Sequence, residues 1–181
     1  MKFFLLAVVL LFAVPASLSA DQEDPRLDIL FDVLAEAPNH QQAWNVEQLI
    51  WAVWLEHENE RVERMMSVSA AAMGEGLLEA ALGEVDKVVA QAPDYAEGWN
   101  RRATILYMMN RFEDSLADIE QVLQLEPRHF GALSGRGLCY MAMGRLEEAE
   151  VALIAALEIH PQMPGAARNL QFIKRQLGNP I

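Results

Sequence analysis

The chain has 181 residues, of which 14 are basic and 26 acidic, so that its formal net charge is −12, and 52% of its residues are hydrophobic. This composition is too apolar for a disordered chain. The negative charge argues against a nucleic-acid binder, which needs a basic surface, and is compatible with a basic or neutral partner. The single cysteine excludes an internal disulfide and every multi-cysteine zinc site.

The first segment, residues 1–20, has the pattern of a secretory signal peptide. Lys2 precedes an unbroken apolar run from Phe3 to Val14, and Pro15 and small residues follow. A helix over that run is about 18 Å long and falls short of a hydrocarbon core about 30 Å thick. We therefore predict a cleaved signal, with a retained anchor as the alternative. The mature protein is then exported, to a bacterial periplasm or outside the cell, with no stable membrane span.

Residues 21–61 are expected to form a pair of helices, read as a degenerate repeat or a cap on the N-terminal side of the following repeats. Leu27 and Phe31 lie on one face of the first helix. The second helix carries three tryptophans, Trp44, Trp51 and Trp54. Two interpretations of them stay open: a core stripe against the first repeat, or an exposed aromatic anchor for a partner, since tryptophan is enriched in interface hot spots.

The rest of the chain follows a period of 34 residues. Prolines recur at this step, and so do residues suited to ending a helix: Pro93, Pro127 and Pro161; Gly76, Asn110, Gly144 and Gly178. Within each period the apolar residues have helical spacing. The pattern predicts three helix–turn–helix units over 62–95, 96–129 and 130–163. A C-terminal helix over 164–181 is expected to cap the last unit.

These units resemble the tetratricopeptide repeat (TPR), whose signature is W-x2-L-G-x2-Y, then A-x3-F, then P. The third unit carries Gly137-x2-Tyr140, Ala149-x3-Leu153 and Pro161 in that register. The resemblance implies an all-α TPR solenoid of about three repeats, with the N-terminal helix pair and the C-terminal capping helix. The whole chain also resembles small exported TPR proteins of Gram-negative bacteria. Arginine replaces the signature leucine in two units, at Arg102 and Arg136, and we interpret both as structural.

The resemblance also implies a concave groove, lined by the first helix of each unit, that binds a peptide or protein partner. The family's carboxylate clamp needs Lys and Asn where this chain has Met66 and Ala70, so that mode is not expected. The alternative for any single methionine or phenylalanine of this set is packing between helices. The matching groove positions are Met66, Met73, Asn100, Arg101, Thr104, Tyr107, Met108, Ser134, Leu138, Met141, Arg168 and Phe172.

We find no catalytic constellation in the sequence and expect neither cofactor nor metal. Ser134 lacks a G-x-S-x-G setting, Cys139 is expected to be a buried, inert thiol, and His129 and His160 are expected to be solvated turn residues. The chain is therefore predicted to be a non-enzymatic protein–protein interaction module, an adaptor or scaffold of the cell envelope. The alternative is a homo-oligomeric structural scaffold that associates through the Trp-rich N-terminal helices.

Overall fold

The computed structural model describes residue 22 and residues 24–178, and this part of the chain is all-α, as predicted. The predicted signal peptide lies outside the described residues. Within them the helices are α1 Arg26–Ala35, α2 His40–Leu55, α3 Glu60–Gly74, α4 Leu78–Gln91, α5 Ala96–Met108, α6 Phe112–Leu125, α7 Phe130–Ala142, α8 Leu146–Ile159 and α9 Pro164–Leu177.

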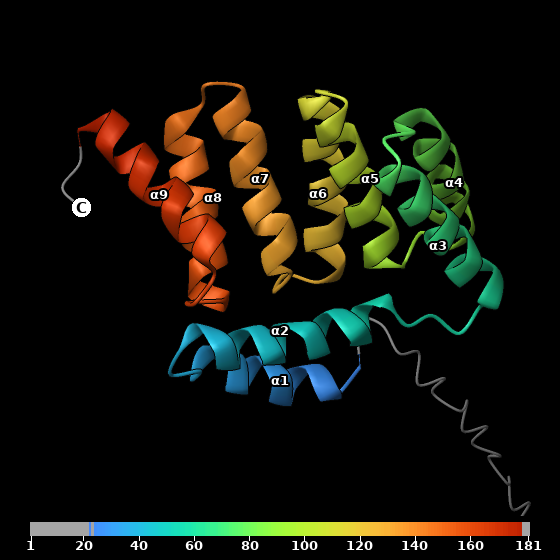
Figure 1. Ribbon diagram of the computed structural model, residues 1–181, viewed down its shortest axis with the longest axis horizontal. Coiled ribbons are helices and arrows are strands. Elements are labelled where there is room, and N and C mark those ends of the chain that lie inside the picture. Colours follow the sequence, from blue (N-terminus) through green and yellow to red (C-terminus); the bar gives the residue numbers. More distant parts are fainter. Residues whose placement is uncertain (1–21, 23, 179–181) are drawn as a thin grey trace, which may run out of the picture.

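Helices α3 to α9 stack side by side in one row, each packed against its neighbour in the chain (Figure 1). The pairs α3/α4, α5/α6 and α7/α8 make the closest contacts, and α9 packs against α8. Ile173 of α9 is fully buried together with Leu153 of α8, so the last helix covers an apolar face that would otherwise meet water. The predicted architecture is thus observed: an all-α solenoid of three helix pairs with a terminal capping helix.

The C-terminal ends of α3, α5, α7 and α9 explain the 34-residue recurrence of glycine. Gly76, Asn110, Gly144 and Gly178 all have positive φ angles, of 76°, 59°, 74° and 70°. A residue in this left-handed conformation reverses the chain after a helix, and glycine adopts it without strain while asparagine tolerates it. One local conformation therefore repeats at all four helix ends that the 34-residue period predicts.

The N-terminal pair α1/α2 does not stack on the first repeat, and that prediction is wrong. It runs along one edge of the solenoid, beside the turns that join successive repeats (Figure 1). Three such turns hold it: Tyr95 Oη donates to the Leu55 carbonyl at 3.3 Å, Arg128 Nη1 pairs with Asp28 at 2.8 Å, and His40 Nδ1 lies 3.2 Å from the carbonyl oxygen of residue 162. The pair is a strap across the repeats instead of a cap at their end.

The strap is held by an aromatic core. Phe31 and Trp54 pack on Phe130, the first residue of α7, with ring centroids 6.4 Å and 5.3 Å away. Trp54 is 1% exposed, Trp51 is half-buried, and Trp44 is 47% exposed. The tryptophans therefore do not form a core against the first repeat. The rings of Trp51 and Trp54 contact His129 and Phe130, where the third repeat begins.

Of the helices that the structure describes, none combines the length and the apolar character needed to cross a membrane.

Candidate peptide-binding groove

A cavity of about 190 Å³ lies between α5 and α7, the first helices of the second and third repeats. Five of the predicted groove residues line it together. Three of them, Asn100, Thr104 and Tyr107, come from α5, and their spacing of i, i+4 and i+7 places them on one face of that helix. The other two, Ser134 and Leu138, come from α7. Both helices that were predicted to line a groove therefore contribute to this cavity, together with Ser115 and Ile119 of α6.

The polar end of the cavity is fixed by a buried carboxylate. Glu97 is 2% exposed and accepts a hydrogen bond from Asn100 Nδ2 at 3.1 Å. His129 Nε2 lies 2.7 Å from Glu97 Oε1, while its Nδ1 accepts from the Ala132 backbone N–H at the start of α7. Because Nδ1 accepts, the Nε2–H is the donor to Glu97. This network connects α5 to α7 and sets the orientation of the Asn100 amide.

Ser115 lines the cavity and is hydrogen-bonded to the buried Cys139. Ser115 Oγ donates to the Ala103 carbonyl at 2.8 Å, and the Cys139 thiol donates to Ser115 Oγ at 3.3 Å. Burial raises the pKa of the Cys139 thiol above its ordinary value, so the nucleophilic thiolate is disfavoured. The prediction that this cysteine is buried is confirmed.

The remaining predicted groove residues do not line the cavity. Met66 is 6% exposed and belongs to the core between α3 and α4, so its assignment to the groove is wrong. Met73 is half-buried against the same core, and Met141 packs against the core of α8 and α9. Long apolar side chains at these positions fill space between helices. The others are elsewhere on the surface of α5 and α9, where they are exposed or half-buried: Arg101, Met108, Arg168 and Phe172.

Small residues of α7 complete the cavity and were missed from the sequence. Gly131 and Gly135 lie one turn apart, and both line the cavity. A Cβ on Gly131 would lie 2.8 Å from the Trp51 ring, which approaches from α2. The spacing of the two glycines was the available signal. Further lining residues are Ala103, Ser115, Ile119, Ala132 and Met163.

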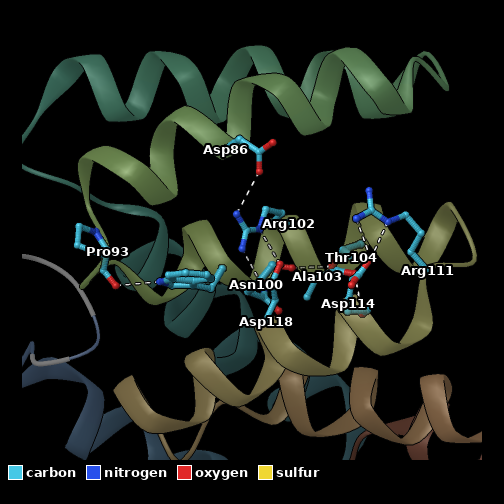
Figure 2. Close-up of polar contacts among 11 residues, drawn as sticks. Asp86, Pro93, Asn100, Arg102, Ala103, Thr104, Arg111, Asp114 and Asp118 are labelled. Atoms are coloured by element: carbon cyan, nitrogen blue, oxygen red, sulfur yellow. Dashed lines mark hydrogen bonds and ion pairs between the residues drawn. The ribbon is translucent and has the colours of Figure 1, made fainter.

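Arg102 faces away from the cavity, and its structural interpretation is confirmed. Figure 2 shows its guanidinium between two aspartates. It binds Asp118 through Nε at 2.7 Å and Nη2 at 2.8 Å, and Asp86 through Nη1 at 3.1 Å. The hydrogen bonds with Asp118 raise the pKa of Arg102 above its ordinary range. This one side chain links α4, α5 and α6.

Both turn histidines are buried, which corrects the expectation that they are solvated. His129 forms the network described above, and His160 Nε2 lies 3.2 Å from Glu47 Oε2 of α2. The hydrogen bond from His160 lowers the pKa of Glu47 below its ordinary value. Among the residues that the structure describes, no group of three or more metal-ligating side chains is gathered at either histidine or elsewhere.

Comparison with known proteins agrees with this architecture. The sequence profile of the tetratricopeptide repeat family matches residues 100–164. A TPR repeat-containing protein of Rhizobium etli is 34% identical over 152 residues, which span 84% of this chain and 74% of that protein. The human DnaJ homolog subfamily C member 3 is 29% identical over 103 residues, which cover 57% of this chain and a fifth (20%) of that protein.

Solved structures share the fold at low sequence identity. The first TPR of Spaghetti (RPAP3), bound to the HSP90 peptide SRMEEVD, aligns with a TM-score of 0.65 at 20% identity and covers 67% of this chain and 97% of that one. MamA aligns with a TM-score of 0.62 at 18% identity and covers 77% of this chain and 79% of that one. With its 34-residue helix pairs and its Rhizobium etli relative, the chain belongs to the tetratricopeptide repeat family.

Proposed function

We propose that this protein is a non-enzymatic interaction module of the cell envelope that holds a peptide or helix of a partner protein between α5 and α7. The observation that carries the proposal is the cavity itself, in which five predicted groove residues from two successive repeats meet. A TPR domain of the same fold is known in complex with a peptide, the HSP90 segment bound by RPAP3.

The cavity has the chemistry that a peptide site needs. Its walls are largely apolar, through Ile119, Leu138 and Met163, so they suit an apolar side chain. Asn100 uses its amide N–H to bind Glu97, and among the described residues its Oδ1 has no donor. That oxygen is available to accept a backbone N–H of the ligand. A few directional polar groups in an apolar cleft give both affinity and orientation.

The cell-envelope setting rests on the sequence of residues 1–20. A short apolar run after Lys2, followed by Pro15 and small residues, supports export with cleavage of this segment. The test is the intact mass of the protein recovered from the exported fraction. A mass that corresponds to a chain starting near residue 20 is expected, and a full-length mass in the membrane fraction would instead indicate a retained anchor.

Filling the cavity tests the interaction itself. Thr104→Trp places a large ring in the cavity from an exposed position on α5. In-cell crosslinking should lose the partner in this variant. The matched control is Val151→Trp on α8, where the side chain is 66% exposed and outside the cavity, and it should keep the partner. A partner retained in both variants would place the interaction elsewhere on the molecule.

A second candidate function, a homo-oligomeric scaffold, is favoured by an apolar surface on the strap. Ile29 and Leu49 are 69% and 55% exposed beside a shallow cavity of about 470 Å³ between α1 and α2. Contiguous exposed apolar surface is typical of interaction sites. Light scattering decides this case. Association that disappears in Ile29→Lys/Leu49→Lys supports the scaffold, and a monomer at high concentration contradicts it.

A further inference from the structure

The charges of the repeats are separated by helix. The second helices, α4, α6 and α8, carry eleven acidic residues and one lysine. Among the first helices, α3 carries two acidic and two basic residues, whereas α5, α7 and α9 carry six basic residues and a single acidic one, the buried Glu97. The acidic net charge of the whole chain therefore does not describe the side of the solenoid on which the cavity opens.

Among the residues that the structure describes, the basic side chains that form no ion pair are also confined to certain helices. Within residues 22 and 24–178, every basic side chain outside α3, α5, α7 and α9 is in an ion pair: Arg26, Lys87, Arg111, Arg128 and Arg145. The basic side chains of the described part that form neither an ion pair nor a hydrogen bond all lie on α3, α5, α7 or α9: Arg61, Arg101, Arg136, Arg168, Lys174 and Arg175. Their charges are not neutralised by the residues that the structure describes and are available to an anionic group.

Two of these arginines continue the lining of the cavity onto α9. Asn100 and Ser134 line the cavity, and the residue 34 positions after Ser134 is Arg168. In the same register Leu138 leads to Phe172, which is 45% exposed, and Arg175 follows Phe172 by three residues. Residues three and four apart share one face of a helix. The face of α9 that extends the groove therefore presents an exposed aromatic ring between two unpaired arginines.

Arg101 provides a cation on the opposite side of the cavity. It is the residue after Asn100 on α5, and 34 positions later lies Gly135, which lines the cavity. A ligand that lies across α5, α7 and α9 thus meets an arginine, then an apolar cavity, then two further arginines around Phe172.

We propose that this face binds an acidic segment of the partner, whose apolar side chain enters the cavity and whose carboxylates contact Arg101, Arg168 and Arg175. The proposal rests on the proposed function and names the chemistry of its ligand. An acidic partner differs from the basic or neutral partner that the net charge of the chain alone suggests. An acidic peptide fits better than a nucleic acid, because three arginines around an apolar cavity neutralise few phosphates and the acidic second helices repel a long polyanion.

The test is selection from a random-sequence peptide display library on the intact protein. Enriched peptides should contain Asp or Glu on both sides of an apolar residue. Resynthesised peptides should bind Arg168→Glu/Arg175→Glu at least about tenfold more weakly, and binding should weaken with added salt. The matched control is Lys87→Glu/Arg111→Glu, which makes the same change in net charge on the side of α4 and α6. Thermal melts establish that both variants are folded, and Arg168→Lys/Arg175→Lys should retain most of the affinity.

The outcomes separate the two levels of the proposal. The selected peptides could lack an acidic bias and yet fail to bind the Thr104→Trp variant. That result would contradict the acidic ligand but would still support peptide binding in the groove. Equal losses in both charge-reversed variants would contradict the acidic ligand as well, because only net charge would then matter. A single-stranded oligonucleotide bound with the same dependence on Arg168 and Arg175 would reassign the face to nucleic acid. If no peptide is enriched, the proposed function fails together with the inference.

Discussion

Trp54 of α2 stacks face to face on His129, with ring centroids 4.2 Å apart and planes inclined by 6°. His129 in turn binds Glu97, and Glu97 holds the amide of Asn100 in the wall of the cavity. The strap formed by α1 and α2 is therefore connected to the groove through side chains in direct contact. This gives the N-terminal pair a role in positioning the second and third repeats against each other.

The contribution of that stack can be measured by truncating the ring. Trp54→Ala should reduce the free energy of unfolding by about 3–5 kcal/mol, since it empties a buried aromatic site. Trp44→Ala removes the same side chain from the same helix where it is 47% exposed, and it should change stability by about 0.5 kcal/mol or less. Urea unfolding of both variants is the measurement.

A third variant keeps this prediction specific. Trp54→Phe retains an aromatic ring and removes an indole N–H that is buried without a hydrogen-bond partner among the described residues, so it should cost much less than alanine. Equal losses for Trp54→Ala and Trp44→Ala would show that the strap does not depend on the stack.

Two glycines of α7 predict opposite responses to the same substitution. A Cβ on Gly137 would lie 2.7 Å from Leu153 Cγ, and Leu153 is fully buried. Gly137→Ala should therefore cost about 1–3 kcal/mol through overpacking. A Cβ on Gly135 would lie 3.6 Å from Ile119 Cδ1, an ordinary contact. Gly135→Ala should be neutral or stabilise the helix by up to about 1 kcal/mol. Thermal unfolding compares them, and a destabilised Gly135→Ala with an unaffected Gly137→Ala would contradict this packing.

We expect the ionised Glu47 to stabilise the fold and this contribution to be lost in acid. Its pKa lies below the ordinary value of 4.5, mainly because of the hydrogen bond with His160. A carboxyl group with a lowered pKa in the folded state contributes stability that is fully present above its unfolded pKa and is lost as the pH falls through the folded pKa. Glu47→Gln should therefore be less stable than the parent at neutral pH and show a flatter decline below about pH 4.5. Glu79→Gln, exposed on α4, is the control and should keep the parent's pH profile.

Removal of residues 164–181 should cause aggregation. Helix α9 buries Ala166 and Ile173 against the core that contains Ala149 and Leu153. The repeats of a solenoid contact only their nearest neighbours, and this face of α8 is covered by α9, so its removal would expose the face to water. Light scattering of the truncated protein should detect large particles. A soluble truncation with an unchanged melting temperature would show that α9 is not the stabilising cap.

The groove was predictable where it depends on the spacing along one helix. Asn100, Thr104 and Tyr107 share a face of α5 because they are separated by one and two turns. Met66 occupies the corresponding position of the first repeat, but it is buried in the core of α3 and α4. The position of a residue within the repeat predicts the direction of its side chain. That position does not predict whether a neighbouring helix covers the side chain.

The sequence by itself determined the helix pairs, their 34-residue period and their left-handed turns. These features depend on local residues: Gly144 and Pro161 each act on the helix end that directly precedes them. Only the tertiary structure decided that the strap lies across the inter-repeat turns and that His160 is buried against Glu47, 113 residues away in the chain. The pattern of an amphipathic helix predicts which face is buried. It does not predict which element packs on that face, because any apolar surface of matching shape can cover it.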